Sequence, residues 1–260
     1  GDKPIHSTYY IEHADFMSCS LDEYVFKYDM LKSLAKGGTF LLNTTFTAEE
    51  LEEKLPNSFK KALAEKKAKF YIINATAIAA KIGMGRRTNT ILQSAFFKLA
   101  NIMPYDQAVE FMKAAAKKSY SKKGDDIVKM NYVAIEKGGK VKRITVKPEW
   151  KDLVVNPVKK PGISEYFDDY ATEINDLRGY DLPVSAFLKG DLLKGSMEAN
   201  TTYNEKRNIA TEVPHWHSEN CIQCGNCVIV CPHATIRAFL PTDEEVAAAP
   251  ALGQDVLKAM

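Results

Sequence analysis

Four cysteines near the C-terminal end of the sequence have the residue type and spacing of metal ligands. Cys221, Cys224, Cys227 and Cys231 lie within eleven residues, and Pro232 follows the last of them. This C-x₂-C-x₂-C-x₃-C-P spacing is that of bacterial ferredoxin-type clusters. Thiolates two residues apart let one tight loop wrap around a corner of a cubane. The sequence therefore predicts that these four cysteines hold a [4Fe–4S] cluster and that the chain handles electrons.

The residues between the cysteines fit the same interpretation. Gly225 permits the positive φ or close backbone approach that such a loop requires. Residues 228–230 are Val, Ile and Val, and we expect them to form an apolar wall that limits water access to the cluster. Pro232 would fix the direction of the chain beyond the fourth thiolate.

A zinc site is the alternative interpretation of this segment. Structural zinc sites usually combine two ligand pairs separated by a dozen or more residues, whereas these four thiols are much closer together. His215, His217 and His233 are near enough in sequence to complete a zinc site. The zinc interpretation therefore stays open beside the cluster.

The fourth cysteine raises a question about a second cluster. In two-cluster ferredoxins the last cysteine of such a run binds the other cluster. Cys221, Cys224 and Cys227 would then need a ligand from a second run, which the sequence does not contain. Either one cluster takes all four thiolates, or the parent chain continues beyond Met260. We favour the second, and the absence of an initiator Met before Gly1 also suggests part of a longer protein.

Composition narrows the class of protein. The chain has 260 residues, a net charge of +2 and 45% hydrophobic residues, enough for a sizeable core. The charge gives no reason to expect nucleic acid or an anionic membrane as a partner. No apolar run reaches the roughly 18–20 residues of a membrane helix, and no signal peptide is evident. Clustered thiols indicate a reducing compartment, so we expect a soluble, cytoplasmic protein.

The elements that would position this chemistry begin with alternating strands and helices. Buried-type strands are expected over residues 14–19, 39–44 and 69–74, with helices over 21–34, 49–55, 58–67 (capped by Asn57) and 75–82. Residues 89–138 read as helical, 142–146 as an edge strand, 164–177 as a helix, and 243–260 as a short helix with a loose end. Such alternation predicts an α/β layered domain with a mostly parallel sheet, followed by a small irregular linker domain and the cysteine segment.

Other residues that could do chemistry have simpler interpretations. Cys19 follows an apolar stretch and is expected to be buried and unreactive. Residues 83–87 (GMGRR) follow a helix, so the dinucleotide-loop interpretation fails. The lysines of residues 117–123 are expected on an exposed helix end, and Lys206 and Arg207 in an interdomain salt bridge. We find no catalytic triad, carboxylate pair or phosphate loop, hence no self-sufficient active site and no catalytic residue to assign.

Several blocks of the sequence resemble one known family, pyruvate:ferredoxin (flavodoxin) oxidoreductase. They occur in the family's order and span nearly the whole chain: 5–9 (IHSTY), 37–44 (GGTFLLNT), 89–98 (NTILQSAFFK), 182–187 (LPVSAF), 203–207 (YNEKR) and 221–237 (CIQCGNCVIVCPHATIR).

The resemblance implies a function for a larger parent enzyme. That enzyme would convert pyruvate and coenzyme A to acetyl-CoA and CO₂ on thiamine diphosphate with Mg²⁺, and pass electrons through three [4Fe–4S] clusters to ferredoxin or flavodoxin. The parent is expected to be a homodimer. Only the cluster ligands Cys221, Cys224, Cys227 and Cys231 carry over to this chain, which is expected to be inactive toward pyruvate alone.

The resemblance also implies a division into domains. Residues 1–155 would be a gamma-type α/β domain lacking its N-terminal part, 156–214 a small linking domain, and 215–260 the first half of a two-cluster ferredoxin domain. Two alternatives stay open: a stand-alone iron–sulfur electron-transfer protein, and a zinc-stabilised interaction module.

Overall fold

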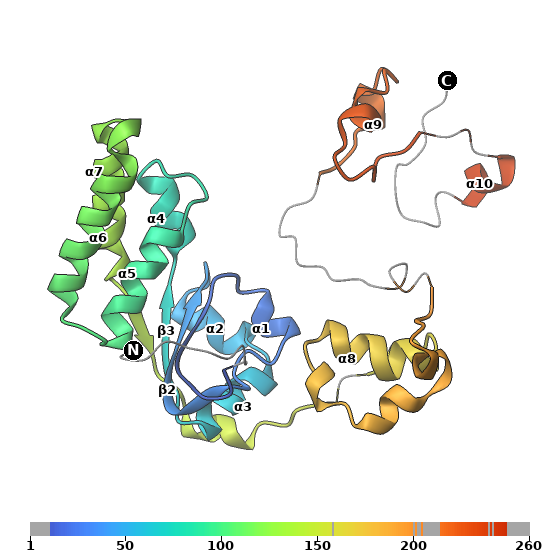
Figure 1. Ribbon diagram of the computed structural model, residues 1–260, viewed down its shortest axis with the longest axis horizontal. Helices are drawn as coiled ribbons and strands as arrows, with labels where there is room; N and C mark the ends of the chain where they lie inside the picture. The colour runs from blue at the N-terminus through green and yellow to red at the C-terminus, as the bar shows by residue number, and fades with distance from the viewer. Residues whose placement is uncertain are drawn as a thin grey trace. The chain divides into compact units, whose positions relative to one another are not determined.

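A computed structural model describes residues 11–157, 159–199, 201, 204, 214–238, 240 and 242–248 (Figure 1). The chain forms two compact units, Gly1–Lys206 and Arg207–Met260, which are treated separately below. The finer division expected from the sequence, at residues 155 and 214, stays a prediction.

The larger unit is built on a four-stranded sheet in the order β1-β2-β3-β4. Strands β1 (Ala14–Cys19), β2 (Leu34–Asn43) and β3 (Lys69–Ile73) are parallel, and β4 (Lys142–Ile144) pairs antiparallel to β3 at the edge. Residues 39–43 of β2 are all buried, as expected for a central strand covered on both faces. The α/β class with a mostly parallel sheet is thus confirmed.

One face of the sheet is covered by α1 (Tyr24–Lys27), α2 (Ala48–Lys54) and α3 (Asn57–Glu65) (Figure 1). Helix α2 starts with a capping box, in which Thr47 and Glu50 satisfy each other's backbone N–H groups. Alternate side chains of β2 pack under these helices with residues of α1–α3 and β3 in a single buried cluster that includes Phe40, Leu42, Leu51, Phe59 and Leu63.

The other face is covered by the helices α4 (Ala75–Lys81), α5 (Asn89–Ala100) and α7 (Asp125–Gly138), and α6 (Tyr105–Tyr120) packs on α5 and α7 (Figure 1). Leu41 of β2 points to this side, since strand side chains alternate between faces, and it packs in a second buried cluster. Helices α5 and α7 approach closely. The buried Ser94 hydroxyl donates to the Ile135 carbonyl oxygen at 2.5 Å.

Two sequence predictions in this unit are wrong. The helix expected over residues 21–34 is only the four-residue α1, after which the chain turns and enters β2 at Leu34. Gly37, with φ +80°, lies inside this strand. Asn57 does not cap α3 either: Pro56 is the N-cap, and the Asn57 amide donates to the Val154 carbonyl oxygen (3.1 Å).

After β4 the larger unit becomes irregular, as the composition indicated. Short 3₁₀ turns alternate with a π-helical turn, Phe167–Ala171, which runs into α8 (Thr172–Asn175). The helix expected over residues 164–177 is therefore present over a shorter span. Arg178 fastens its end, donating from Nε and Nη2 to the two carboxylate oxygens of Glu173 (2.8 and 3.0 Å).

The smaller unit contains a 3₁₀ turn, Ser218–Asn220, and two short helices, α9 (Asn226–Val230) and α10 (Asp243–Ala248). None of its residues with a described side chain is buried. A segment with so little buried core is not expected to be stable by itself. It needs a bound metal or another part of the protein to pack against. Residues 249–260, part of the tail expected to be helix and loose end, lie outside the described residues.

Candidate iron–sulfur site

The cysteine segment is a loop, the short helix α9 and a turn. Cys221 and Cys224 lie in the loop, Cys227 in α9, and Cys231 directly after it. Gly225 has φ +73°, so the positive φ expected at this glycine is confirmed. None of these four cysteines forms a disulfide, and none is buried. The Gln223 N–H donates to the Cys221 sulfur at 3.4 Å.

The Cys231 sulfur lies in a turn that supplies several hydrogen bonds. The Thr235 hydroxyl lies 3.5 Å from Cys231 Sγ. This hydroxyl, together with the backbone N–H groups of Ile236, His233 and Thr235, lowers the pKa of the Cys231 thiol to about 6. Hydrogen bonds to the thiolate favour the charged form. Cys231 is therefore prepared as a thiolate, the form in which cysteine binds metal.

The structure does not gather the four sulfurs around one point. Among the described residues, no three His, Cys, Asp or Glu side chains are grouped so as to hold a metal ion. The expected apolar wall is also not formed, because Ile229 and Val230 are 81% and 74% exposed. The donor set itself fits an iron–sulfur cluster: four cysteines outside any disulfide lie in one short segment, and a backbone N–H group donates to one of the sulfurs.

Two of the three histidines of the zinc alternative contact other side chains. The rings of His215 and His217 pack edge to face with centroids 4.7 Å apart. The Nδ1 atom of His217 lies 3.0 Å from a carboxylate oxygen of Glu219. These contacts give zinc no particular support, and the metal stays a matter for direct measurement.

Cys19 lies apart from this segment, at the end of β1. It is only 2% exposed, which confirms the expected buried position. Burial, reinforced by the Asp22 carboxylate, raises the pKa of the Cys19 thiol to about 11. The thiol is therefore protonated at neutral pH, and a nucleophilic role is disfavoured.

The two basic segments are surface features. Residues 83–87 form a turn between α4 and α5, so they follow a helix as expected, and Arg86 and Arg87 are exposed. Lys117 and Lys118 are exposed in the last turn of α6, where cations interact favourably with the helix dipole. Lys206 and Arg207 lie outside the described residues.

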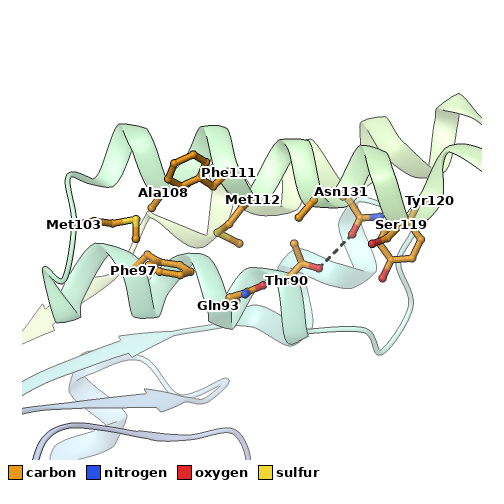
Figure 2. Close-up of a pocket in the computed structure, with 12 residues that line it drawn as sticks. Thr90, Gln93, Phe97, Met103, Ala108, Phe111, Met112, Ser119, Tyr120 and Asn131 are labelled. Carbon is orange, nitrogen blue, oxygen red and sulfur yellow. Dashed lines mark hydrogen bonds between the residues drawn. The ribbon is translucent and has the colours of Figure 1, made fainter. Parts of the chain in front are cut away.

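A cleft of about 340 Å³ lies between α5 and α6, with Asn131 contributed by α7 (Figure 2). The Thr90 hydroxyl donates to the Asn131 side-chain oxygen (3.2 Å) at one end. Tyr120 is the one titratable side chain in its lining of described residues: Thr90, Gln93, Phe97, Met103, Ala108, Phe111, Met112, Ala115, Ala116, Ser119, Tyr120 and Asn131. Such a lining does not supply a set of acid, base and nucleophile.

The carboxyl ends of β1 and β2 carry polar residues that the sequence analysis did not single out. The Thr44 hydroxyl donates to the Asp22 carboxylate at 2.6 Å, and the Asn43 amide bridges Ser20 and Ala75. Open α/β sheets commonly bind ligands at this edge. Here the groups satisfy one another, so we assign them a structural role. The signal in the sequence was the pair Asn43-Thr44 at the end of an apolar run.

No helix in the part of the chain that the structure describes has the length and apolarity needed to cross a membrane.

Comparison with known proteins accounts for both units. A model of the pyruvate ferredoxin/flavodoxin oxidoreductase family matches residues 1–141, and a 4Fe-4S binding domain model matches residues 214–237. The two matches together place the chain among the iron–sulfur oxidoreductases. Since the first match covers more than half of the sequence, the chain belongs to the pyruvate ferredoxin/flavodoxin oxidoreductase family.

Individual relatives agree with this assignment. A pyruvate:ferredoxin oxidoreductase of Moorella thermoacetica is 42% identical over 255 residues, and a pyruvate-flavodoxin oxidoreductase of Enterobacter agglomerans is 44% identical over 255. Each alignment covers 96% of this chain and 21% of the relative, so the chain spans about a fifth of their length. Among solved structures, the PORC subunit of Thermotoga maritima pyruvate oxidoreductase aligns with a TM-score of 0.40 and 21% identity, covering 51% of this chain and 66% of the subunit.

Proposed function

We propose that this chain is the electron-carrying middle part of a thiamine diphosphate-dependent 2-oxoacid oxidoreductase. The whole enzyme would convert pyruvate and coenzyme A to acetyl-CoA and CO₂, with ferredoxin or flavodoxin as electron acceptor. The observation that carries the proposal is identity of 42–44% to such enzymes along 96% of the chain, including the cysteine segment. Thiamine diphosphate and Mg²⁺ would be bound by other parts of that enzyme, which we propose to be a cytoplasmic homodimer.

In this proposal Cys221, Cys224, Cys227 and Cys231 are the cluster ligands. A bound [4Fe–4S] cluster accepts and donates single electrons. The protein's own part is to present four accessible thiolates, to bend the loop at Gly225 and to direct N–H groups at the Cys231 sulfur. Cys231 would bind either the same cluster as the other three or a second one, as in two-cluster ferredoxins.

In the larger enzyme the α/β unit would be the family domain that precedes this segment in the chain. A stand-alone electron carrier would not need a 141-residue family domain ahead of its cysteines, so the electron-carrier alternative is the weaker one. We further propose that the chain alone does not oxidise pyruvate, since it corresponds to a fifth of the relatives' length.

Anaerobic reconstitution followed by electron transfer tests the proposal. After reduction with dithionite and removal of the excess, the chain should show the paramagnetic signal of a reduced cluster. Adding oxidised flavodoxin or ferredoxin should transfer the electron to the acceptor, so the signal of the chain's own cluster should give way to the absorption change of the reduced acceptor. Cys224→Ser is the matched control and should give a weaker signal.

Two outcomes would contradict the proposal. A chain that gives no paramagnetic signal after reconstitution does not carry electrons in this way. Coenzyme A-dependent turnover of pyruvate by the purified chain would show that it holds a complete active site.

A further inference from the structure

The turn after Cys231 forms a compact hydrogen-bonding environment around one sulfur atom. The Ala234 N–H donates to the Cys231 carbonyl oxygen (3.2 Å), and Ala234 has φ +50°, in the left-handed region. This turn brings the hydroxyl of Thr235 to 3.5 Å from Cys231 Sγ. The backbone N–H groups of His233, Thr235 and Ile236 contribute with this hydroxyl to the lowered pKa of the Cys231 thiol.

All of these donors lie within five residues of Cys231 in the sequence. Their arrangement therefore depends on the local turn and not on the packing of distant elements. When Cys231 is a thiolate or is bound to metal, its sulfur has no proton to donate, so the Thr235 hydroxyl becomes the donor. Three of the four donors belong to the backbone, and the Thr235 hydroxyl is the one that a side-chain substitution can remove.

We propose that Thr235 is a positioning residue that raises the reduction potential of the cluster bound by Cys231, through a hydrogen bond from its hydroxyl to the ligand sulfur. The inference rests on the proposed function. Reduction adds one electron and therefore negative charge to the cluster and its thiolates. A hydrogen bond to a charged acceptor strengthens as that charge grows, and hydrogen bonds to the sulfurs are one of the determinants of cluster potential.

Two substitutions of Thr235 separate the effect of its hydroxyl from the effect of its side-chain shape, and a third substitution, at Thr242, is the control. Thr235→Val keeps the branched shape and removes the hydroxyl, whereas Thr235→Ser keeps the hydroxyl and removes the methyl group. Thr242→Val is the matched control in the same unit, since the Thr242 hydroxyl bonds Glu245 at the start of α10 and not a cysteine.

The test is an anaerobic redox titration of the reconstituted 260-residue chain, read by its optical and paramagnetic spectra, with iron and sulfide measured for each variant. Thr235→Val should make reduction less favourable by about fivefold in the equilibrium constant. At 59 mV per tenfold for one electron, this is a potential about 40 mV lower. Thr235→Ser and Thr242→Val should match the original chain. Failure of Thr235→Val to assemble a cluster, with normal assembly of Thr235→Ser, would also support the hydroxyl's role at Cys231.

Equal potentials for Thr235→Val and the original chain overturn this inference alone. So does a Thr235→Ser variant that shifts as far as Thr235→Val, because the branched shape would then be responsible. Absence of iron and sulfide from the original chain overturns the proposed function, and this inference with it.

Discussion

The side-chain amide of Asn43, at the end of β2, donates from Nδ2 to the carbonyl oxygen of Ser20, just past the end of β1, at 3.0 Å. The same amide accepts from the Ala75 N–H, at the start of α4, through Oδ1 (2.9 Å). One buried side chain thus joins the chain past β1 to the segment past β3. Asn43 is 7% exposed, so little water is at hand to replace these bonds.

Replacing Asn43 should therefore destabilise the α/β unit. Asn43→Ala leaves the Ser20 carbonyl and the Ala75 N–H without this partner, and we expect a loss of about 2 kcal/mol in the free energy of unfolding. Urea unfolding followed by the fluorescence of the buried Trp150 measures it. Gln107→Ala, an exposed amide on α6, should change stability by less than about 0.5 kcal/mol. Equal effects of the two substitutions would show that the Asn43 bridge is unimportant.

Gly138 permits the close approach of α5 and α7. A Cβ atom at this position would lie 2.3 Å from the backbone carbonyl oxygen of Ile91, which cannot move without shifting the helix. Gly138→Ala should destabilise the unit by about 3 kcal/mol despite alanine's higher helix propensity. At Gly139 the clash would be with the Tyr105 hydroxyl, a side-chain atom that can swing away. Thermal unfolding should therefore rank Gly139→Ala as the milder change, and the reverse order would contradict this packing.

Cys19 should be the least reactive of the five cysteines. Its pKa, raised to about 11 from an ordinary value of 9.0, reduces the thiolate fraction at pH 8 by about a hundredfold. Iodoacetamide should modify the other four cysteines in the native chain and all five in urea, as read by peptide mass spectrometry. Rapid modification of native Cys19 would show that the end of β1 is open to solvent.

The raised pKa of Cys19 also predicts how stability depends on pH. The folded chain keeps the proton up to about pH 11, whereas the unfolded chain begins to lose it near pH 9. The contribution to stability is therefore complete below pH 9 and is lost as the pH rises from 9 to 11. Urea unfolding between pH 9 and pH 11 compares Cys19→Ala with the original chain. The free energy of unfolding should fall less over this range in Cys19→Ala than in the original chain. Parallel losses would contradict the assignment.

Much of the fold could be predicted from local sequence signals. The strands β1 and β3 and the helices α2 and α4 agree with the sequence prediction to within a residue or two, because apolar runs and the Thr47–Glu50 capping box are local signals. The helix predicted over residues 21–34 failed for a long-range reason. Tyr24, Leu31 and Leu34 have helical spacing, but they face one core from a short helix, a turn and a strand. Leu34 pairs with Ala14 of β1, so it belongs to a strand and not to a helix. The spacing of apolar residues alone does not reveal this pairing.

The candidate site divides in the same way. The spacing of the four cysteines is read directly from the sequence. The positive φ of Gly225 is a local property of the loop between them, so it could be predicted. The apolar wall of residues 228–230 was expected but not found, since burial of those side chains requires packing partners that the described residues do not provide. The position of the Thr235 hydroxyl, close to the Cys231 sulfur, depends on the left-handed turn at Ala234. The residue types did not indicate this turn.

The most direct test of the account is metal and sulfide analysis of the chain, prepared and reconstituted without oxygen, together with an absorption spectrum. We predict iron and acid-labile sulfide in equal amounts and broad absorption near roughly 400 nm from thiolate-ligated iron. Cys221→Ser and Cys227→Ser should lower both contents, whereas Cys19→Ala should not. Zinc without sulfide, or iron that survives all the ligand substitutions, would contradict the assignment of these four cysteines to an iron–sulfur cluster.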